Sequence, residues 1–207
     1  MWYLVLITVV AAYFLGNING AVCISTWLEH DDVRNHGSGN AGLTNFLRNY
    51  GGWSTLLVIL IDMGKTAVAC LLGGALLDNS GFGKEGMMLA AVASSLGHDF
   101  PALFGFKGGK GILSGFTAAL IIDWRIGLII LAVFVICVVL SKYVSLASVM
   151  AAATFGICFV LFYPDKPWVA VGGVLMAVLA IFMHRANIAR LCKGTENKFS
   201  IHKKEKH

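Results

Sequence analysis

The sequence of 207 residues has little charge and almost no proline. Charged side chains make up 13% of it and proline occurs three times, whereas hydrophobic residues make up 57%. A soluble domain averages about 25% charged and roughly 45–50% apolar residues. This composition excludes an ordinary soluble domain, a disordered chain and a nucleic-acid-binding protein. It indicates a helical protein for which lipid is part of the solvent.

The sequence also lacks the patterns of disulfide frameworks, metal sites and covalent nucleophiles. Its five cysteines form no CxxC pair, and neither the HExxH spacing of a metal site nor a GxSxG motif occurs. We therefore expect no metal and no cofactor, and we interpret the cysteines as small hydrophobic residues. Four of them lie in apolar runs, namely Cys23, Cys70, Cys137 and Cys158.

Seven apolar stretches approach the length of about 20 residues that a membrane helix requires. The third and fourth are short, and fusing them would leave six spans. The first should be retained as a helix, because no basic residue precedes it and no cleavage site follows it. The sequence predicts an all-α integral membrane protein with seven transmembrane helices in one domain, residues 1–207. The stretches are Trp2–Ile24, Trp53–Leu77, Gly86–Leu96, Gly111–Ile122, Ile126–Leu140, Val144–Tyr163 and Trp168–Met183.

The basic residues fall mostly on one side of these seven stretches. Lys84, Arg125 and Lys166 are on one side, and twelve basic residues are on the other. Cytoplasmic loops carry the excess of Lys and Arg, so the N-terminus is predicted outside and the C-terminus in the cytoplasm. The twelve are Arg34, Arg48, Lys107, Lys110, Lys142, Arg185, Arg190, Lys193, Lys198, Lys203, Lys204 and Lys206.

A first polar cluster follows the first apolar stretch. Residues 34–45 read RNHGSGNAGLTN. Glycine-rich backbone of this kind can present N–H groups to an anion, and a following helix would place Thr44 and Arg48 on one face. The alternative is a flexible turn between spans. The candidate binding residues are Gly37, Ser38, Gly39, Asn40, Thr44, Asn45 and Arg48.

The same loop matches the dinucleotide-binding pattern GxGxxG over residues 37–42, and Asp62 lies further along the chain. That pattern has meaning only after a β-strand and within a βαβ unit. Here no strand precedes it, and Asp62 lies inside an apolar helix. We therefore reject a dinucleotide site.

A second polar cluster precedes the fourth apolar stretch. Residues 98–111 read HDFPALFGFKGGKG. Ammonium groups beside a helix N-terminus favour phosphate, but this is no Walker P-loop, because Phe104 stands where glycine is required. The alternative is a glycine-rich turn that carries positive charge. The candidates are His98, Lys107, Gly108, Gly109, Lys110 and Gly111.

Two further clusters lie on the same side, at the start of the sixth stretch and the end of the last one. Ser145 and Ser148 share a face at a helix start, where they could cap the helix or reach a ligand. His184 and Asn187 are expected on one helix face, with Arg190 and Glu196 nearby. A purely structural role is the alternative for a histidine near the interface.

One charged pair, Asp62 and Lys65, lies within the second apolar stretch. Charges inside a membrane are costly, so the pair is either functional or simply neutralises itself. Together the clusters predict a membrane site for one or more phosphates. The residues alone leave two classes open, an enzyme and a transporter of phosphate esters or anions.

In this order the clusters resemble the PlsY-type family of acyl-phosphate:glycerol-3-phosphate acyltransferases. The matching stretches are GSGNAGLTNFLR, DMGK, GHDFPALFGFKGGKG, SLAS and HRANIARL-x-x-GTE. The resemblance implies an enzyme of the bacterial cytoplasmic (inner) membrane with its active site facing the cytoplasm. Its substrates would be acyl phosphate and glycerol 3-phosphate, its products lysophosphatidic acid and phosphate, and its surroundings membrane lipid, without nucleic acid.

The resemblance also implies site residues. Ser38, Lys110, His184 and Asn187 are expected to be catalytic, with Ser38, Lys110 and the amides of residues 108–111 neutralising the leaving phosphate. Nearby cations would weaken His184 as a base, so we expect the donor's phosphate to accept the proton. The expected substrate-binding residues are Gly37, Gly39, Asn40, Thr44, Asn45, Arg48, Lys65, His98, Lys107, Gly108, Gly109, Gly111, Ser145, Ser148, Arg190 and Glu196.

Four places depart from the family pattern, and all are conservative. The family usually has GSIP at residues 16–19, glycine at Thr66, VAT at residues 112–114 and arginine at Lys142. We expect the activity to survive these changes.

Overall fold

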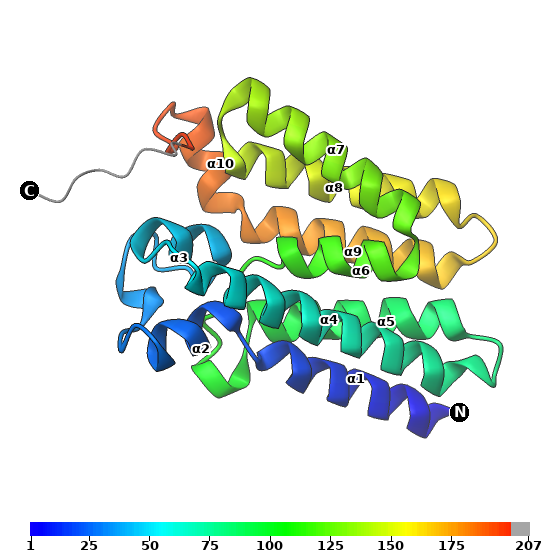
Figure 1. Cartoon of the computed structure of the whole chain (residues 1–207). Coiled ribbons are helices and arrows are strands. Elements are labelled where there is room, and N and C mark those ends of the chain that lie inside the picture. Colours follow the sequence, from blue (N-terminus) through cyan, green and yellow to red (C-terminus); the bar gives the residue numbers. More distant parts are fainter. Residues whose placement is uncertain (200–207) are drawn as a thin grey trace, which may run out of the picture.

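The computed structural model describes residues 1–199, and these fold into helices and connecting loops. The long helices run side by side (Figure 1). Two short 3₁₀ turns, η1 (Val33–Asn35) and η2 (Ala102–Phe104), lie in the loops. The α-helices are α1 (Trp2–Asn17), α2 (Gly20–Trp27), α3 (Leu43–Asn49), α4 (Ser54–Asp78), α5 (Gly83–Asp99), α6 (Ile112–Ile122), α7 (Trp124–Ser141), α8 (Val144–Phe162), α9 (Pro167–Met183) and α10 (Arg185–Cys192).

The first apolar stretch is broken into α1 and α2 by two buried asparagines. The Asn17 amide donates to the Tyr13 carbonyl at 2.8 Å, and its oxygen accepts from the Leu103 amide at 3.1 Å. Asn19 caps α2 by accepting from the Val22 amide at 3.0 Å. Asparagine side chains that bond to backbone groups compete with the helix, which explains the break.

Glycines bring α1, α4 and α5 into close contact. A Cβ atom on Gly16 or Gly97 of one helix would collide with the backbone of the other, and the same holds for Gly73 and Gly86 of α4 and α5. Small residues at such crossings permit the close packing that holds membrane helices together. These three helices therefore form a tight unit that begins at the N-terminus.

The other helices pack around α6. Helix α6 contacts α4 and α5 on one side and α7 and α8 on the other, while α9 packs against both α5 and α8. The core here includes Phe155, Phe159, Met88 and Ile126, all at most 4% exposed. Many large apolar side chains point outward along the helices, as expected for a surface that faces lipid.

Five helical segments are long and apolar enough to cross a membrane, and the bent pair α9 and α10 would make a sixth. All seven predicted stretches are helical, but α6 has only 11 residues. The predicted bounds lie within a few residues of those observed. An all-helical chain is therefore confirmed for residues 1–199, whereas the count of seven spans stays a prediction.

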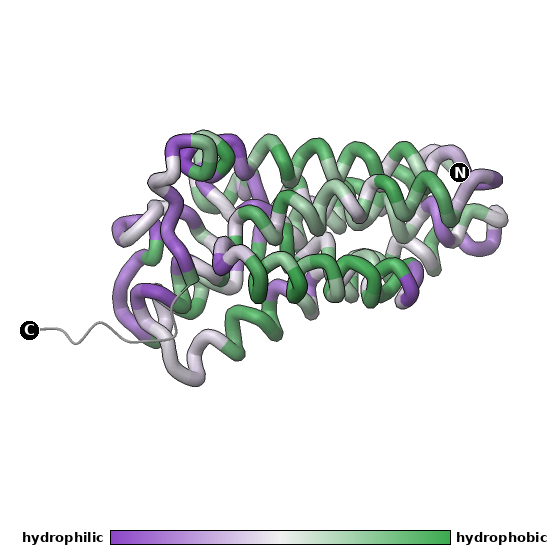
Figure 2. Tube along the Cα trace, turned by 90° about the horizontal axis from the view of Figure 1, so that it is seen from above, coloured by the Kyte–Doolittle hydropathy of each residue, from purple (hydrophilic) through white to green (hydrophobic). Residues whose placement is uncertain are grey.

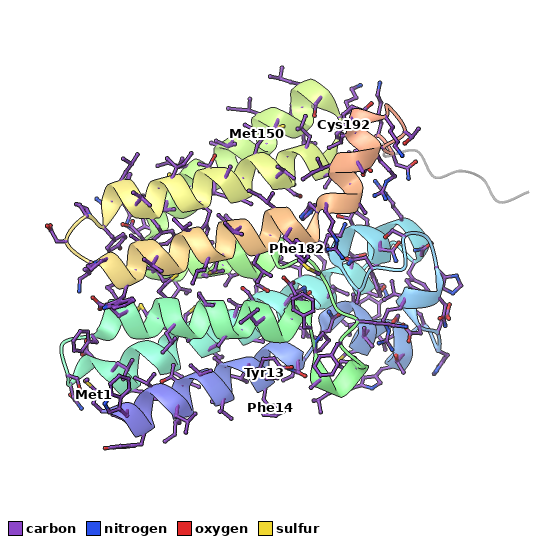
Figure 3. All side chains as sticks on the ribbon, turned by 180° about the vertical axis from the view of Figure 1, so that it is seen from behind. Met1, Tyr13, Phe14, Met150, Phe182 and Cys192 are labelled. Atoms are coloured by element: carbon purple, nitrogen blue, oxygen red, sulfur yellow. The ribbon has the colours of Figure 1, made fainter. Side chains whose placement is uncertain are left out.

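Polar backbone and side chains gather at one end of the bundle. Figure 2 shows hydrophilic segments at the end that holds α3, α10 and their loops, with hydrophobic segments along most of the length. Phe182 and Cys192 lie near this end, and Met1 lies at the opposite one (Figure 3). The structure thus places the polar, glycine-rich loops together at one end of the apolar helix bundle.

Candidate active site

A cavity of about 700 Å³ opens among the polar loops and continues between helices. Its polar part is lined by residues from the loop before α3, from the α5–α6 loop and from α10. Its apolar part is lined by α6, α7, α8 and α9. The apolar wall consists of Leu113, Phe116, Ile130, Leu131, Phe134, Ala151, Ala152, Phe155, Met176 and Ala177.

The amide of Asn45 organises the loop that contains GSGN. Its nitrogen donates to the carbonyls of Val33 (3.0 Å), His36 (3.0 Å) and Asn40 (3.1 Å), and its oxygen accepts from the Ser38 amide at 3.0 Å. Asn45 lines the cavity, and its amide group forms five hydrogen bonds, since its oxygen also accepts from Asn49 Nδ2 at 3.2 Å. The loop itself thus uses the hydrogen-bonding groups of this side chain, and the predicted contact between Asn45 and substrate stays a prediction.

The two glycine-rich loops are joined. The Ala41 amide and the Asn40 side chain both donate to the Gly108 carbonyl, at 3.2 and 3.3 Å. The Asn19 side chain holds the Ala41 carbonyl from the other side at 3.0 Å. The expectation that these clusters belong to one site is thus supported by direct contact between them.

Gly108 and Gly109 lie against His98, and neither lines the cavity. The Gly109 amide donates to the His98 carbonyl at 3.0 Å, and a Cβ on Gly109 would overlap the imidazole ring. The Gly109 amide is thus engaged by the His98 carbonyl, and its predicted role toward phosphate stays a prediction. Lys110 and Gly111 do line the cavity, and the left-handed φ of Gly111, +65°, turns the chain into α6.

A hydrogen-bond network of three side chains orients Lys110. Its ammonium donates to Asn187 Oδ1, and Asn187 Nδ2 donates to Glu196 Oε1 at 2.8 Å. Arg190 Nε donates to Glu196 Oε2 at 2.6 Å. All four residues line the cavity. This network fixes the amide orientation of Asn187, because the amide nitrogen must face the carboxylate and the amide oxygen must face the ammonium.

Burial and neighbouring charges shift the pKa of the groups at both ends of this network. Burial lowers the pKa of the Lys110 ammonium, and Arg190 lowers it further while Glu196 raises it. Burial tends to raise the pKa of Glu196, but hydrogen bonds from Asn187 and Arg190 outweigh it and hold that pKa below its usual value. The site therefore keeps an ionised carboxylate behind a cluster of cations.

His184 lies at a break between α9 and α10, which are bent by 57° relative to each other. His184 is the N-cap residue of α10 and Asn187 lies three residues further on, and both line the cavity. His184 Nδ1 lies 2.8 Å from the Ala180 carbonyl. A carbonyl only accepts, so the proton sits on Nδ1 and leaves Nε2 of the neutral ring as an acceptor.

Lys65 and Lys107 lie outside the cavity wall. The Lys65 ammonium donates to the Ile18 carbonyl (2.6 Å) and to Asp62 (2.7 Å), and lies 2.8 Å from His98 Nδ1. Lys65 therefore packs behind His98, and its predicted contact with substrate stays a prediction. Lys107 is exposed and does not line the cavity, and neither does Gly39. Their predicted contacts with substrate stay predictions.

The remaining predicted residues line the cavity. Thr44 and Arg48 lie one turn apart on α3, and Gly37 and Ser38 line the cavity beside them. Ser145 and Ser148 line it from the first turns of α8, where Ser148 donates to the Val144 carbonyl at 2.9 Å. The roles of these residues toward substrate stay predictions.

Ser95, Asp99 and Asn197 line the cavity, but the sequence analysis did not predict them. Asp62 also lines the cavity, although it was interpreted only as part of a charged pair. Ser95 and Asp99 were detectable in principle, since they are four residues apart and share a helix face with each other. The apolar wall carried no distinguishing signal, because its residues resemble those of any membrane helix.

A helical bundle with a cavity that carries cations at its mouth and apolar side chains inside suits an integral membrane protein that handles amphipathic, phosphate-bearing molecules. Comparison with known proteins specifies the class. Residues 6–194 match the family model described as glycerol-3-phosphate acyltransferase. The chain belongs to this family, as the sequence motifs predicted, and it is an integral membrane protein.

The similarity extends over nearly the whole chain. The glycerol-3-phosphate acyltransferase of Thermoanaerobacter sp. (strain X514) is 38% identical over 192 residues, which cover 93% of this chain and 94% of that protein. That of Finegoldia magna is 37% identical over 196 residues, covering 95% and 96%.

Two crystal structures of PlsY (YgiH), an integral membrane glycerol 3-phosphate acyltransferase, have the same fold. The glycerol 3-phosphate form matches with a TM-score of 0.84 and 34% identity, covering 95% of this chain and 96% of that one. The lysophosphatidic acid form matches with a TM-score of 0.81 and 32% identity, covering 95% of both.

Proposed function

We propose that the chain transfers a fatty acyl group from acyl phosphate to glycerol 3-phosphate, giving lysophosphatidic acid and phosphate. The observation that carries this is the shape of the cavity, which joins a cationic mouth to an apolar interior. The interior suits an acyl chain, and the mouth suits the phosphate groups of both substrates. The ligands named for the related PlsY structures are this acceptor and this product.

Two groups of residues would hold the two phosphates. Thr44 and Arg48 form one group, and Ser38, Lys110, Arg190 and the first turn of α6 form the other. Charge-assisted hydrogen bonds from Lys and Arg are the strong contacts for phosphate oxygens. Holding both substrates in one geometry would supply much of the rate, because effective molarities in well-aligned reactions are large.

The reaction proceeds by direct attack of the glycerol 3-phosphate hydroxyl on the acyl carbonyl. A C–O bond forms to the acceptor, the bond from the acyl carbon to the phosphate oxygen breaks, and phosphate leaves. Lys110 neutralises the charge that develops on the leaving phosphate. The hydroxyl proton passes to a phosphate oxygen of the donor, while His184 Nε2 and Asn187 orient the reacting groups.

The chain crosses the bacterial cytoplasmic membrane seven times as a single domain, with its N-terminus outside and its active site in the cytoplasm. The excess of Lys and Arg in the loops of the polar end supports this orientation. Cys192 provides a test, because it is exposed on α10 at that end. A membrane-impermeant maleimide should label Cys192 in inverted vesicles and not in intact cells, and should label a cysteine placed at Lys84 in intact cells. The reverse pattern would overturn the orientation.

The proposed activity is tested with purified protein in detergent, acyl phosphate and glycerol 3-phosphate. We expect one lysophosphatidic acid and one phosphate for each acyl phosphate consumed. A transporter of phosphate esters would form no product in this assay, but would take up glycerol 3-phosphate when reconstituted in vesicles. Formation of product only from another acyl donor would contradict the choice of acyl phosphate.

A further inference from the structure

Two residues of α5 that line the cavity, Ser95 and Asp99, carry buried side-chain oxygens that lack a hydrogen-bond partner. Ser95 is 3% exposed and Asp99 is 2% exposed. Among residues 1–199, none forms a hydrogen bond to Ser95 Oγ or to Asp99 Oδ1. Buried polar atoms are nearly always hydrogen-bonded, and a buried carboxyl group without a partner is especially costly. Ser94 Oγ is likewise unpartnered but does not line the cavity, whereas Asp99 and Ser95 do, so a molecule that enters the cavity could supply their partner.

The Asp99 carboxyl group lies next to the loop that we assign to phosphate. Asp99 ends α5, and a Cβ on Gly111 would lie 3.3 and 3.5 Å from its two carboxyl oxygens. Gly111 directly follows Lys110, whose ammonium is held toward the cavity by Asn187. Ser95 lies one turn earlier on the same face of α5. The pair thus adjoins the phosphate site but belongs to a separate wall of the cavity.

The side chains of Asp99 and Ser95 suit only one kind of group that the two substrates carry. A carboxylate repels phosphate, and a fatty acyl chain offers no polar group to satisfy it. A hydroxyl group fits in either protonation state of the acid, because it donates to a carboxylate and accepts from a carboxylic acid. Glycerol 3-phosphate carries two hydroxyls, and only one of them is acylated.

We infer that Asp99, assisted by Ser95, forms a subsite for the second hydroxyl of the acceptor, the one that is not acylated. The inference rests on the proposed function and extends it from the reaction to the selection of the acceptor. A site built to bond a hydroxyl rejects an analogue that lacks it, because its buried polar groups then stay unpaired. Asp99 would therefore determine specificity without taking part in bond making.

The test compares two acceptors, glycerol 3-phosphate and 3-hydroxypropyl phosphate, which lacks only the second hydroxyl. For the unaltered protein we expect kcat/KM to be about 10- to 100-fold higher with glycerol 3-phosphate, the range that one hydrogen bond to a charged group supports. Asp99→Ala should reduce kcat/KM for glycerol 3-phosphate to near that for the analogue and leave the analogue's value unchanged. Ser95→Ala should move it in the same direction by less.

Ser94→Ala is the matched control, because Ser94 is buried on α5 and does not line the cavity. It should keep the full preference for glycerol 3-phosphate. Equal loss with both acceptors in Asp99→Ala would overturn the inference, as would equal use of both acceptors by the unaltered protein. Loss of an ionisation from the pH–rate profile in Asp99→Asn would instead make Asp99 a base and also overturn it. If the unaltered protein acylates neither acceptor, the proposed function itself fails.

Discussion

The Lys110 ammonium donates a hydrogen bond to Asn187 Oδ1, which joins the α5–α6 loop to α10 across the mouth of the cavity. The amide nitrogen of Asn187 in turn faces Glu196. Asn187 therefore links the Glu196 carboxylate to the Lys110 ammonium, the cation that we assign to the leaving phosphate. If Lys110 acts on the leaving phosphate as we propose, α10 contributes to catalysis through Asn187.

Replacing Asn187 should separate these groups. We expect Asn187→Ala to reduce kcat by about 10²-fold, the usual cost of losing one oriented hydrogen-bonding group at a charged transition state. Steady-state kinetics with both substrates would measure it. Lys193→Ala, at the exposed end of α10, is the control and should have no effect. Activity close to normal in Asn187→Ala would show that Lys110 needs no such support.

Glu196 predicts how stability depends on pH. Because the folded state lowers its pKa below the usual 4.5, the folded state favours the ionised form. The contribution to stability is therefore complete above pH 4.5 and is lost as the pH falls through the lower value of the folded state. The Tm difference between the unaltered protein and Glu196→Gln should be constant from pH 6 to 8 and shrink below pH 4.5. A difference that grows on acidification would contradict the assignment.

His184 is predicted to orient the substrate and not to act as the base. With its proton on Nδ1, the ring offers Nε2 to a hydroxyl. His184→Ala should reduce activity by about 10²-fold through loss of alignment, and the pH–rate profile should keep its shape. His184→Gln provides the decisive comparison. If it removes an ionisation near pH 6–7 that the unaltered protein shows in kcat/KM, then His184 is the base.

Gly109 should tolerate no side chain. A methyl group there would overlap the His98 ring and displace Lys110, the next residue. We expect Gly109→Ala to lower kcat/KM for glycerol 3-phosphate by up to about 10²-fold, as misplacement by about 1 Å can. Gly64→Ala is the matched control, because a methyl group at that position of α4 would meet open space. Equal effects of the two substitutions would refute a local role for Gly109.

The sequence predicted the elements well because the length of the apolar runs determines them. All seven stretches are helical, and the four polar clusters that the motifs marked do meet at one end. Charge asymmetry and glycine content sufficed to locate that end, since loops between membrane helices must satisfy their polar backbone there.

The sequence could not show which polar groups are already occupied. Asn45 and Gly109 carry donors that a phosphate could use, but the loops use those donors for their own carbonyls. Lys65 lies behind His98 because Asp62 and the carbonyl of Ile18 hold it there. Such assignments depend on contacts between distant segments, and no local pattern encodes them.

Direct acyl transfer requires that no acyl-enzyme intermediate forms. A single-turnover experiment with acyl phosphate labelled in its acyl group tests this requirement most directly. After rapid acid quenching, we expect all label in acyl phosphate or lysophosphatidic acid and none on the protein, both with and without glycerol 3-phosphate. Label that appears on the protein and then passes to glycerol 3-phosphate at the rate of turnover would contradict direct transfer.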